Sequence, residues 1–228
     1  MGVSKVNDVR HKNPPKLDFI YFATVSQIKY RHYEAIFAEN NIELRHGAVL
    51  SSFPIGQEID DCGNTGKPDI VYNPLRQAAR FVTDAGQTPY MLENTMLFIQ
   101  HFSKNMVGLT GLPGADSENW WINLGSKGIL DIMETITDRS AIMICQIGIY
   151  LGESRYKFAV GETEGVISSE IRVSDKAKKD IPYSNPFFFH EIFIPNDWSK
   201  TLAEMDGAEF SQVDYRRKAV RKFLSDNK

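Results

Sequence analysis

The sequence has few cysteines, little net charge and no long apolar run, and each shortage excludes a class of protein. Its two cysteines, Cys62 and Cys145, lie far apart, which excludes a disulfide framework and indicates a reducing compartment. The formal net charge of −3 gives no electrostatic footprint for nucleic acid, although basic residues cluster near the C-terminus. No apolar run approaches the roughly 18 to 20 residues that span a bilayer, and residues 1–16 lack the apolar core of a signal peptide. We therefore expect a cytoplasmic protein with no nucleic-acid partner and no membrane contact.

The composition is that of a globular protein with a full core. With 228 residues, 42% hydrophobic and 24% charged, the chain can bury the core of one large domain or of two intimate lobes. Residues 1–16 are polar and end in Asn13-Pro14-Pro15, which predicts a disordered lead-in. Residues 17–228 are predicted to form a single domain of two lobes, without an internal repeat.

The first half of the chain alternates strand and helix patterns. Leu17–Thr24 is a short apolar run typical of a buried central strand, and the helical spacing of apolar residues begins after Ser26. A second strand is predicted at 42–52, a helix at 74–84 and the end of a third strand at 90–92. This alternation predicts an α/β fold.

The second half is dominated by strand patterns. Beyond His101 the pattern is irregular up to a helix predicted at 126–136. Two strands are predicted at 140–150 and 155–161, joined by a hairpin connection at 151–154. A continuing strand at 171–173, an apolar segment at 187–195 and a basic helix at about 211–224 follow. One extended mixed sheet flanked by helices is therefore expected. The basic helix also has an apolar side, so we interpret it as a packed helix rather than a surface for an acidic partner.

A polar triplet, Glu93-Asn94-Thr95, interrupts the apolar run between Pro89 and His101. We interpret Tyr90–Leu92 as the end of a buried strand and the triplet as the polar edge that this strand carries to the surface. Open α/β sheets place ligand sites at the carboxyl ends of core strands. Glu93 and Asn94 are therefore the first candidates for chemistry, and an ordinary exposed turn is the alternative.

The turn after the first predicted strand carries groups that bind phosphate. Thr24 and Ser26 offer hydroxyls, the first N–H groups of a helix are unpaired, and Lys29 lies one turn into the helix. The alternative is that Ser26 merely caps the helix while Lys29 is solvated. Both interpretations remain open on the sequence.

Eight stretches of the chain, in five groups, match in order the motifs of one known family. A Thr-x-Asn-x-x-Lys turn corresponds to 24–29, a Val-Glu-Asp-Thr-x-Leu strand end to 92–97 and a Gly-x-Pro-Gly loop to 111–114. An Arg-Ser-Ala strand start corresponds to 139–141 and a Gly-x-x-x-Gly-x-Ile turn to 161–167. The three C-terminal motifs correspond to 187–193, 200–204 and 214–219. On these motifs the chain resembles, over residues 17–224, the inosine triphosphate pyrophosphatase family of Ham1-like enzymes.

The resemblance implies a long bent mixed β-sheet in two lobes with a central cleft, commonly in a homodimer. It implies hydrolysis of non-canonical purine nucleoside triphosphates to monophosphate and pyrophosphate, with Mg²⁺ offsetting the charge on the phosphates. Glu93 and Asn94 are the implied catalytic residues, and Glu93 with Glu58, or else Asp60 or Asp61, would hold the metal. The implied substrate-binding residues are Thr24, Ser26, Lys29, Thr95, Gly114, Phe189, His190, Lys200, Tyr215 and Arg216.

The sequence departs from the family pattern at residues that the family uses for catalysis and for substrate binding. The aspartate of Glu-Asp-Thr is Asn94 here, and a neutral amide neither holds Mg²⁺ nor accepts a proton as well as a carboxylate does. The asparagine of the phosphate turn is Ser26. The motifs that read the purine have become Phe-Phe-Phe-His-Glu at 187–191 and Asp-Tyr-Arg at 214–216, which should change or abolish base preference.

Three functions are compatible with this mixture of retained and altered motifs. The first is a Mg²⁺-dependent nucleoside triphosphate pyrophosphatase whose base preference has moved away from inosine and xanthosine. The second is a binding module or partner subunit that keeps the nucleotide cleft and has lost hydrolysis. The third is another reaction on a nucleotide-like substrate, with His190 or Tyr215 as a new acid or base; packing beside aromatic residues is the alternative for His190.

Overall fold

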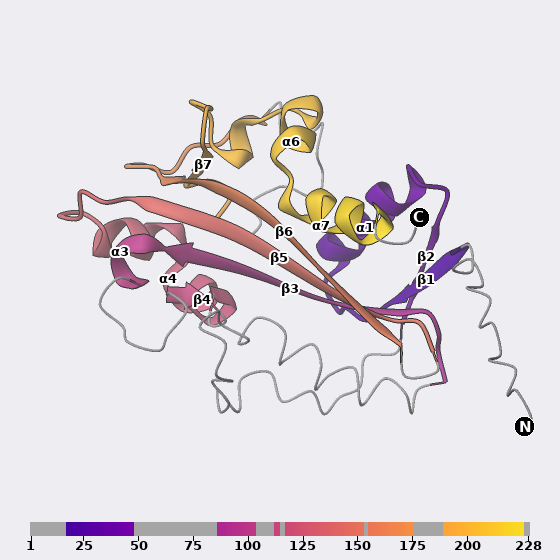
Figure 1. The fold of residues 1–228 in the computed structure, drawn as a ribbon. Coiled ribbons are helices and arrows are strands. Elements are labelled where there is room, and N and C mark those ends of the chain that lie inside the picture. Colours follow the sequence, from indigo (N-terminus) through magenta and orange to yellow (C-terminus); the bar gives the residue numbers. More distant parts are fainter. Residues whose placement is uncertain are drawn as a thin grey trace, which may run out of the picture.

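The computed structural model describes residues 17–47, 86–103, 112–114, 117–152, 155–175 and 189–225. Its centre is one seven-stranded sheet in the order β2-β1-β3-β5-β6-β7, with β4 beside β3 (Figure 1). The strands are β1 (Phe19–Phe22), β2 (Glu43–His46), β3 (Tyr90–Ile99), β4 (Leu112–Gly114), β5 (Ser140–Tyr150), β6 (Tyr156–Ile167) and β7 (Phe193–Pro195).

The predicted α/β fold, one extended mixed sheet flanked by helices, is confirmed. The predicted lead-in at 1–16 and the predicted helix at 74–84 lie outside the described residues. Within the described part of the chain, no helix is both long enough and apolar enough to cross a membrane.

The first two strands form a parallel unit around α1 (Gln27–Ala38). β1 pairs in parallel with β2 on one side and with β3 on the other. Because consecutive parallel strands need a crossover, α1 carries the chain from β1 over the sheet to β2. β1 is therefore an interior strand, as predicted, although it is shorter than 17–24. Of the second predicted strand, the described part is the short β2, and residues from 48 onward lie outside the description.

The remaining strands form an antiparallel ladder whose long members run side by side (Figure 1). All eleven residues of β5 pair with β6, which confirms the predicted hairpin. β6 runs through Gly161 and Gly165 and ends at Ile167, so the predicted turn at 161–167 and the predicted strand at 171–173 are wrong. The ladder with β5 holds these glycines extended, because strand pairing outweighs the weak intrinsic preference of glycine.

The polar triplet does not lie at the end of its strand. β3 continues to Ile99, so the prediction of a strand ending at Leu92 is wrong. The cause is the ladder with β5, which continues without interruption past the triplet. The triplet nevertheless lies on an open edge, since β1 pairs with β3 only as far as Met91 and β4 begins to pair at Leu97. Between these two points, none of the described strands pairs with this side of β3.

Two helices differ from their predicted bounds, and the first is α4 (Ser117–Ile132). It begins within the stretch predicted to be irregular and includes Trp120 and Trp121; Gly125 interrupts it with a φ of 61°. Its start is anchored to the sheet, because the Ser117 hydroxyl accepts a hydrogen bond from the N–H of Leu97 at 2.8 Å. A contact between distant segments therefore sets this boundary. The short helix α3 (Gln100–Ser103) directly follows β3.

The predicted basic helix at 211–224 is in fact two helices, α6 (Gly207–Val213) and α7 (Tyr215–Ser225). They are separated at Asp214, whose backbone is extended with a ψ of 107°. The Asp214 carboxylate accepts a hydrogen bond from the N–H of Arg216 at 2.9 Å, which caps the start of α7. A short 3₁₀ helix, Leu202–Glu204, precedes α6.

Helices α1 and α7 lie on one face of the sheet (Figure 1). The apolar side of α7, with Ala219, Val220 and Phe223, is buried, which confirms that the basic helix is a packed helix. Its close approach to β6 requires a glycine at 161. A methyl group there would overlap the carbonyl oxygen of Tyr215 and the backbone nitrogen of Ala219.

Gly161→Ala is expected to lower the free energy of unfolding by about 3 kcal/mol or more, because the added methyl group meets backbone atoms of α7 that cannot rotate away. The control is Gly152→Ala, whose Cβ would have its nearest neighbour at 3.9 Å but whose φ is 85°. Backbone strain alone should cost this control about 1 to 2 kcal/mol. Urea unfolding measures both values, and equal losses would contradict the close packing of α7 on β6.

Candidate functional site

The turn between β1 and α1 is held by its own hydroxyl groups. Thr24 Oγ1 accepts a hydrogen bond from the N–H of Ser26 at 3.1 Å, and Ser26 Oγ accepts one from the N–H of Lys29 at 3.3 Å. Ser26 is thus the N-cap of α1. No described residue accepts a hydrogen bond from the N–H groups of Gln27 and Ile28 in the first turn. These groups, at the positive end of the helix dipole, suit an anion, so capping by Ser26 is compatible with phosphate binding.

This turn lies beside the open edge of β3. The carbonyl of Met91 accepts a hydrogen bond from the N–H of Ala23 at 3.1 Å, and the N–H of Leu97 faces Ser117 on the same side. Because backbone groups alternate along a strand, those of Glu93 and Thr95 are directed at the edge between them. The sheet order reverses here, since β1 leads to β2 on one side and has β3 on the other. Ligand sites of α/β sheets lie at such switch points.

The Glu93 carboxylate lies between two cations that come from two helices. Its side chain is 0% exposed, and one oxygen is 2.9 Å from Lys29 Nζ of α1. The other oxygen is 3.4 Å from Arg216 Nε of α7 and accepts a hydrogen bond from the Thr95 hydroxyl. One buried carboxylate therefore joins α1, β3 and α7.

The two cations keep Glu93 ionised despite its burial. Burial by itself raises the pKa of Glu93, but the charges of Lys29 and Arg216 and the hydrogen bond from Thr95 lower it to about 2. A carboxylate with so low a pKa is a poor general base near neutral pH. In this geometry Glu93 is a fixed negative charge that holds Lys29 at the edge of the sheet.

The Arg216 guanidinium is 1% exposed and is satisfied by several side chains. It donates hydrogen bonds to Thr95 Oγ1 at 3.0 Å, to Tyr215 Oη at 3.1 Å and to His32 Nδ1 at 3.4 Å. Because His32 Nδ1 accepts, its Nε2 donates to Asp214 Oδ2, at 2.8 Å. Burial raises the pKa of Asp214, and the contact with His32 and the charge of Arg216 lower it below its usual value. The network thus extends from Lys29 to the start of α7.

Three members of this cluster, His32, Asp214 and Cys145, were not among the predicted site residues. His32 lies three residues after Lys29 on α1, so the helical spacing could have placed both side chains on one face. Its partner Asp214 is distant in the sequence, and no local pattern shows that contact. Cys145 Sγ lies 2.9 Å from Tyr33 Oη and 3.9 Å from Glu93 Oε1. Burial raises the pKa of the Cys145 thiol, so it is not activated as a nucleophile.

The residues predicted to read the base are buried in the protein. Phe189, His190 and Tyr215 are each no more than 1% exposed. His190 Nε2 lies 2.8 Å from Tyr215 Oη, and the Phe189 ring meets Trp121 edge to face at a centroid distance of 5.2 Å. This arrangement favours the packing interpretation of His190.

Two other predicted site residues, Lys200 and Gly114, have partners outside the Glu93 network. Lys200 Nζ pairs with Glu209 of α6 at 2.6 Å. Gly114 pairs with Leu97 in the β3–β4 ladder, and its carbonyl accepts a hydrogen bond from Ser117 at 2.5 Å. Glu58 lies outside the described residues, as do Asp60 and Asp61, which are the other predicted metal ligands.

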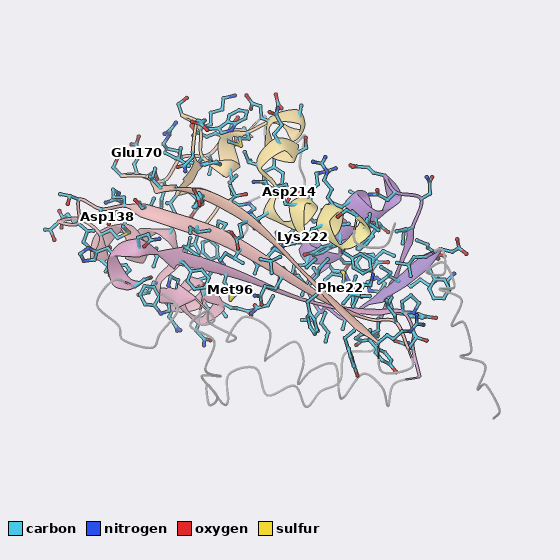
Figure 2. All side chains as sticks on the ribbon, in the orientation of Figure 1. Phe22, Met96, Asp138, Glu170, Asp214 and Lys222 are labelled. Carbon is cyan, nitrogen blue, oxygen red and sulfur yellow. The ribbon has the colours of Figure 1, made fainter. Side chains whose placement is uncertain are left out.

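Asn94 projects from the opposite face of the sheet. Successive side chains alternate across a strand, so Asn94 points away from Glu93 and Thr95. Met96, two residues further on, projects from the face away from α7 (Figure 2). Asn94 is directly opposite Gln146 of β5 in the ladder. The two predicted catalytic residues therefore lie on different faces of β3 and cannot act as a carboxylate–amide pair on one atom.

The described residues do not fit a resident Mg²⁺ ion. Among them, no group of three or more His, Cys, Asp or Glu side chains is arranged to hold a metal. Glu93 has its oxygens engaged by Lys29, Arg216 and Thr95, and a divalent cation would have to displace these partners. The prediction of Glu93 and Glu58 as a metal pair thus has no support among the described side chains.

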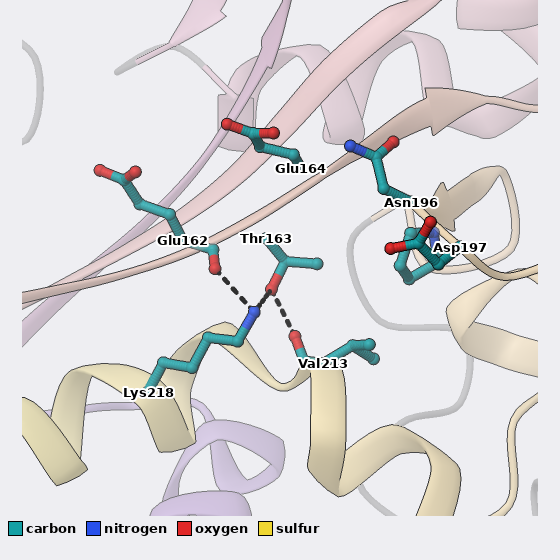
Figure 3. A pocket seen from close by; sticks show the side chains of 8 residues that line it. Glu162, Thr163, Glu164, Asn196, Asp197, Val213 and Lys218 are labelled. Atoms are coloured by element: carbon teal, nitrogen blue, oxygen red, sulfur yellow. Dashed lines mark hydrogen bonds between the residues drawn. The ribbon is translucent and has the colours of Figure 1, made fainter.

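A separate hollow of about 410 Å³ lies between β6 and the C-terminal segments (Figure 3). Lys218 Nζ donates hydrogen bonds there to the Glu162 carbonyl and to Thr163 Oγ1, both at 2.9 Å, and so ties α7 to β6. The carboxylates of Glu162, Glu164 and Asp197 border this hollow, and their charge would repel a triphosphate. The hollow is therefore not the candidate site for an anionic substrate.

Comparisons with known proteins agree with the fold. The model of the Ham1 family matches residues 20–226. The dITP/XTP pyrophosphatase of Pyrococcus horikoshii is 36% identical over 136 residues, which make up 60% of this chain and 63% of that protein. The dITP/XTP pyrophosphatase of Ignicoccus hospitalis is 26% identical over 208 residues, 89% of this chain and 93% of that protein.

Solved structures of Ham1 proteins have the same fold. The Ham1 protein of Staphylococcus aureus has a TM-score of 0.62 at 20% identity and covers 92% of this chain and 100% of its own. A HAM1 protein from Coxiella burnetii has a TM-score of 0.64 at 21% identity, with 92% and 98% covered. The likeness extends over both the parallel and the antiparallel parts of the sheet.

Glu93→Gln is expected to lower the free energy of unfolding at pH 7 by about 3 to 5 kcal/mol, because it leaves the charges of Lys29 and Arg216 without their buried partner. Glu43→Gln removes one partner of the exposed Glu43–Arg45 pair and serves as the control, with no measurable change expected. Urea unfolding followed by circular dichroism measures both. A loss no larger than that of the control would contradict the role assigned to Glu93.

The stabilisation by Glu93 should also depend on pH in a defined direction. Since folding lowers the pKa of Glu93 from 4.5 to about 2, its contribution is fully present above pH 4.5 and is lost as the pH falls towards about 2. The stability difference between wild type and Glu93→Gln should therefore shrink over this window. Unfolding titrations at several pH values test it, and a difference independent of pH would exclude the ion pairs as its source.

Proposed function

The chain belongs to the Ham1 family, and we propose that it hydrolyses a nucleoside triphosphate to the nucleoside monophosphate and pyrophosphate. The relatives named dITP/XTP pyrophosphatases support this class of reaction. The observation in this chain that carries the proposal is the meeting of the α1 N-terminus with the Lys29–Glu93 pair at the open edge of β3. Helix N-termini and lysines are the groups with which proteins hold polyphosphates.

In this proposal the triphosphate binds at the turn between β1 and α1. The N–H groups of Gln27 and Ile28 donate to phosphate oxygens, and the Lys29 ammonium supplies positive charge. Lys29 is 23% exposed whereas Glu93 is 0% exposed, so the ligand reaches the cation and not the anion behind it. A lysine already held by a buried carboxylate loses less side-chain entropy when a phosphate binds. Thr24 and Ser26 contribute by fixing the shape of the turn.

Mg²⁺ is part of the substrate in this proposal. A hard divalent cation on the phosphates offsets the charge that develops when pyrophosphate leaves. The described residues lack a ligand cluster of their own, which is consistent with a cation that arrives on the nucleotide.

The proposed base preference differs from that of an enzyme selective for inosine and xanthosine. The Tyr215 hydroxyl is used by His190 and Arg216, and Phe189 is 0% exposed. A pocket discriminates through hydrogen-bonding groups that a wrong base leaves unpaired. With these groups engaged inside the protein, discrimination between bases should be weak. The proposed assembly, from the family resemblance, is a homodimer.

The second candidate function is nucleotide binding without hydrolysis. Asn94 favours it, because an amide cannot take a proton from the attacking water as an aspartate can. Both candidate functions use the same phosphate turn, and only a measurement of hydrolysis distinguishes them.

We expect the protein to release pyrophosphate from nucleoside triphosphates in the presence of Mg²⁺. The assay compares purine, pyrimidine and deaminated triphosphates, with and without Mg²⁺, beside Asn94→Asp. Turnover by the natural sequence would establish the pyrophosphatase and identify its base class. If the natural protein releases no pyrophosphate but Asn94→Asp does, the binding function is favoured. If neither protein releases pyrophosphate, the pyrophosphatase is excluded.

Lys29→Met is expected to raise KM for the triphosphate by about 10- to 100-fold, since it removes a charged contact to the phosphates. Lys127→Met, which changes an exposed lysine paired with Asp131 on α4, should leave KM unchanged. Lys29→Arg preserves the pairing with Glu93 and shows whether any loss comes from misfolding rather than from the missing charge. An unaltered KM in a folded Lys29→Met protein would exclude the phosphate role.

A further inference from the structure

Gln146 of β5 has a buried side-chain amide that forms no hydrogen bond with the described residues. The residue is 1% exposed, and among the described residues neither its Oε1 nor its Nε2 has a hydrogen-bond partner. A primary amide has two donors and an acceptor, and leaving them unsatisfied inside a protein is unfavourable. Such a group in a folded protein calls for an explanation, and a missing ligand is one.

Gln146 projects from the same face as Asn94. The two residues are directly opposite each other in the β3–β5 ladder, so their side chains stand next to each other. Two residues along β3 on either side of Asn94, the same face carries the buried apolar side chains of Leu92 and Met96. On the other side of Gln146, its partner in β6 is Val160. Asn94 is therefore the polar neighbour of Gln146 across the β3–β5 ladder.

The position of this pair connects it with the phosphate turn. Asn94 lies in the stretch of β3 that β1 and β4 leave unpaired, between that edge and Gln146. Lys29 pairs with Glu93 on one face of the sheet, and Asn94 projects from the other face beside the same edge. Gln146, on the neighbouring strand β5, lies next to Asn94 on the same face and further from this edge.

We propose that Asn94 and Gln146 form a neutral amide subsite that donates hydrogen bonds to phosphate oxygens of the nucleotide. This inference rests on the proposed function, because it takes a nucleoside triphosphate as the ligand.

The chemistry of the pair favours an anionic oxygen as its ligand. An amide nitrogen donates to a phosphate oxygen without carrying charge, whereas a carboxylate at the same position would repel it. Asparagine at position 94 thus changes the task of this position from proton acceptor to hydrogen-bond donor. Gln146 supplies the second donor, and the ligand satisfies the amide for which the described residues offer no partner.

The test is Gln146→Leu, which removes the amide and keeps a side chain of similar size. Without ligand, the variant should melt about 2 to 4 °C higher than wild type, because an unsatisfied buried polar group is gone. Its affinity for the Mg²⁺ complex of α,β-methylene-dITP, measured by calorimetry, should fall at least about tenfold. Unchanged affinity, or a lower melting temperature, would overturn the subsite.

Two further variants show whether the amides act together. Asn94→Ala should weaken binding of the same analogue, and the double variant should lose less affinity than the two single losses combined, because neighbouring groups on one ligand are coupled. Strict additivity would overturn a shared subsite. Ile144→Leu, an apolar change on the same face of β5, is the matched control and should leave affinity unaltered.

The outcomes separate this inference from the proposed function. If wild type hydrolyses triphosphates and Gln146→Leu binds the analogue equally well, the subsite fails and the function stands. If wild type hydrolyses nothing yet binds the analogue more tightly than Gln146→Leu, the pyrophosphatase fails and the subsite stands. If wild type neither hydrolyses triphosphates nor binds the analogue, both fail.

Discussion

The buried carboxylate of Glu93 is the constraint on which the rest of the site depends. A lone charge inside a protein is too costly to keep, so Glu93 requires Lys29 from α1 and Arg216 from α7 at the same time. Arg216 in turn requires His32 and Tyr215, because its remaining donors must also be satisfied. His32 is itself held by Asp214. The parallel N-terminal unit and the C-terminal helix are thereby joined to the middle of β3, and the partly exposed Lys29 is held by the same contact.

The edge of β3 between its pairings with β1 and β4 has backbone groups that no described strand uses. A strand that is paired on both sides has no backbone groups for a ligand, whereas β3 is unpaired by described strands between β1 and β4. The edge also brings together side chains of opposite faces, Glu93 with its cations on one and Asn94 on the other. The N-terminus of α1, Lys29 and Asn94 lie around this edge, while the carboxylate-lined hollow lies elsewhere, between β6, β7 and α7.

Predictions from local patterns succeeded where the determinant is local. The apolar run of β1, the cap at Ser26 and the hairpin between β5 and β6 each depend on residues close together in the chain. The errors arose where a distant contact decides. Pairing with β5 carries β3 past the polar triplet, and the same strand holds the glycines of β6 extended. Asp214 interrupts the C-terminal helix because its carboxylate caps α7 and binds His32.

The sequence by itself determined the fold class, the family and most members of the polar cluster, since periodicity, turn residues and motif order are properties of the chain. Only the tertiary structure decided what those members do. Burial paired Glu93 with Lys29 and Arg216, and strand alternation placed Asn94 on the opposite face of the sheet. Register brought the unpartnered amide of Gln146 beside Asn94. The physical reason is that the state of a charge or an amide depends on its burial and its partners, and those partners come from segments far away in the sequence.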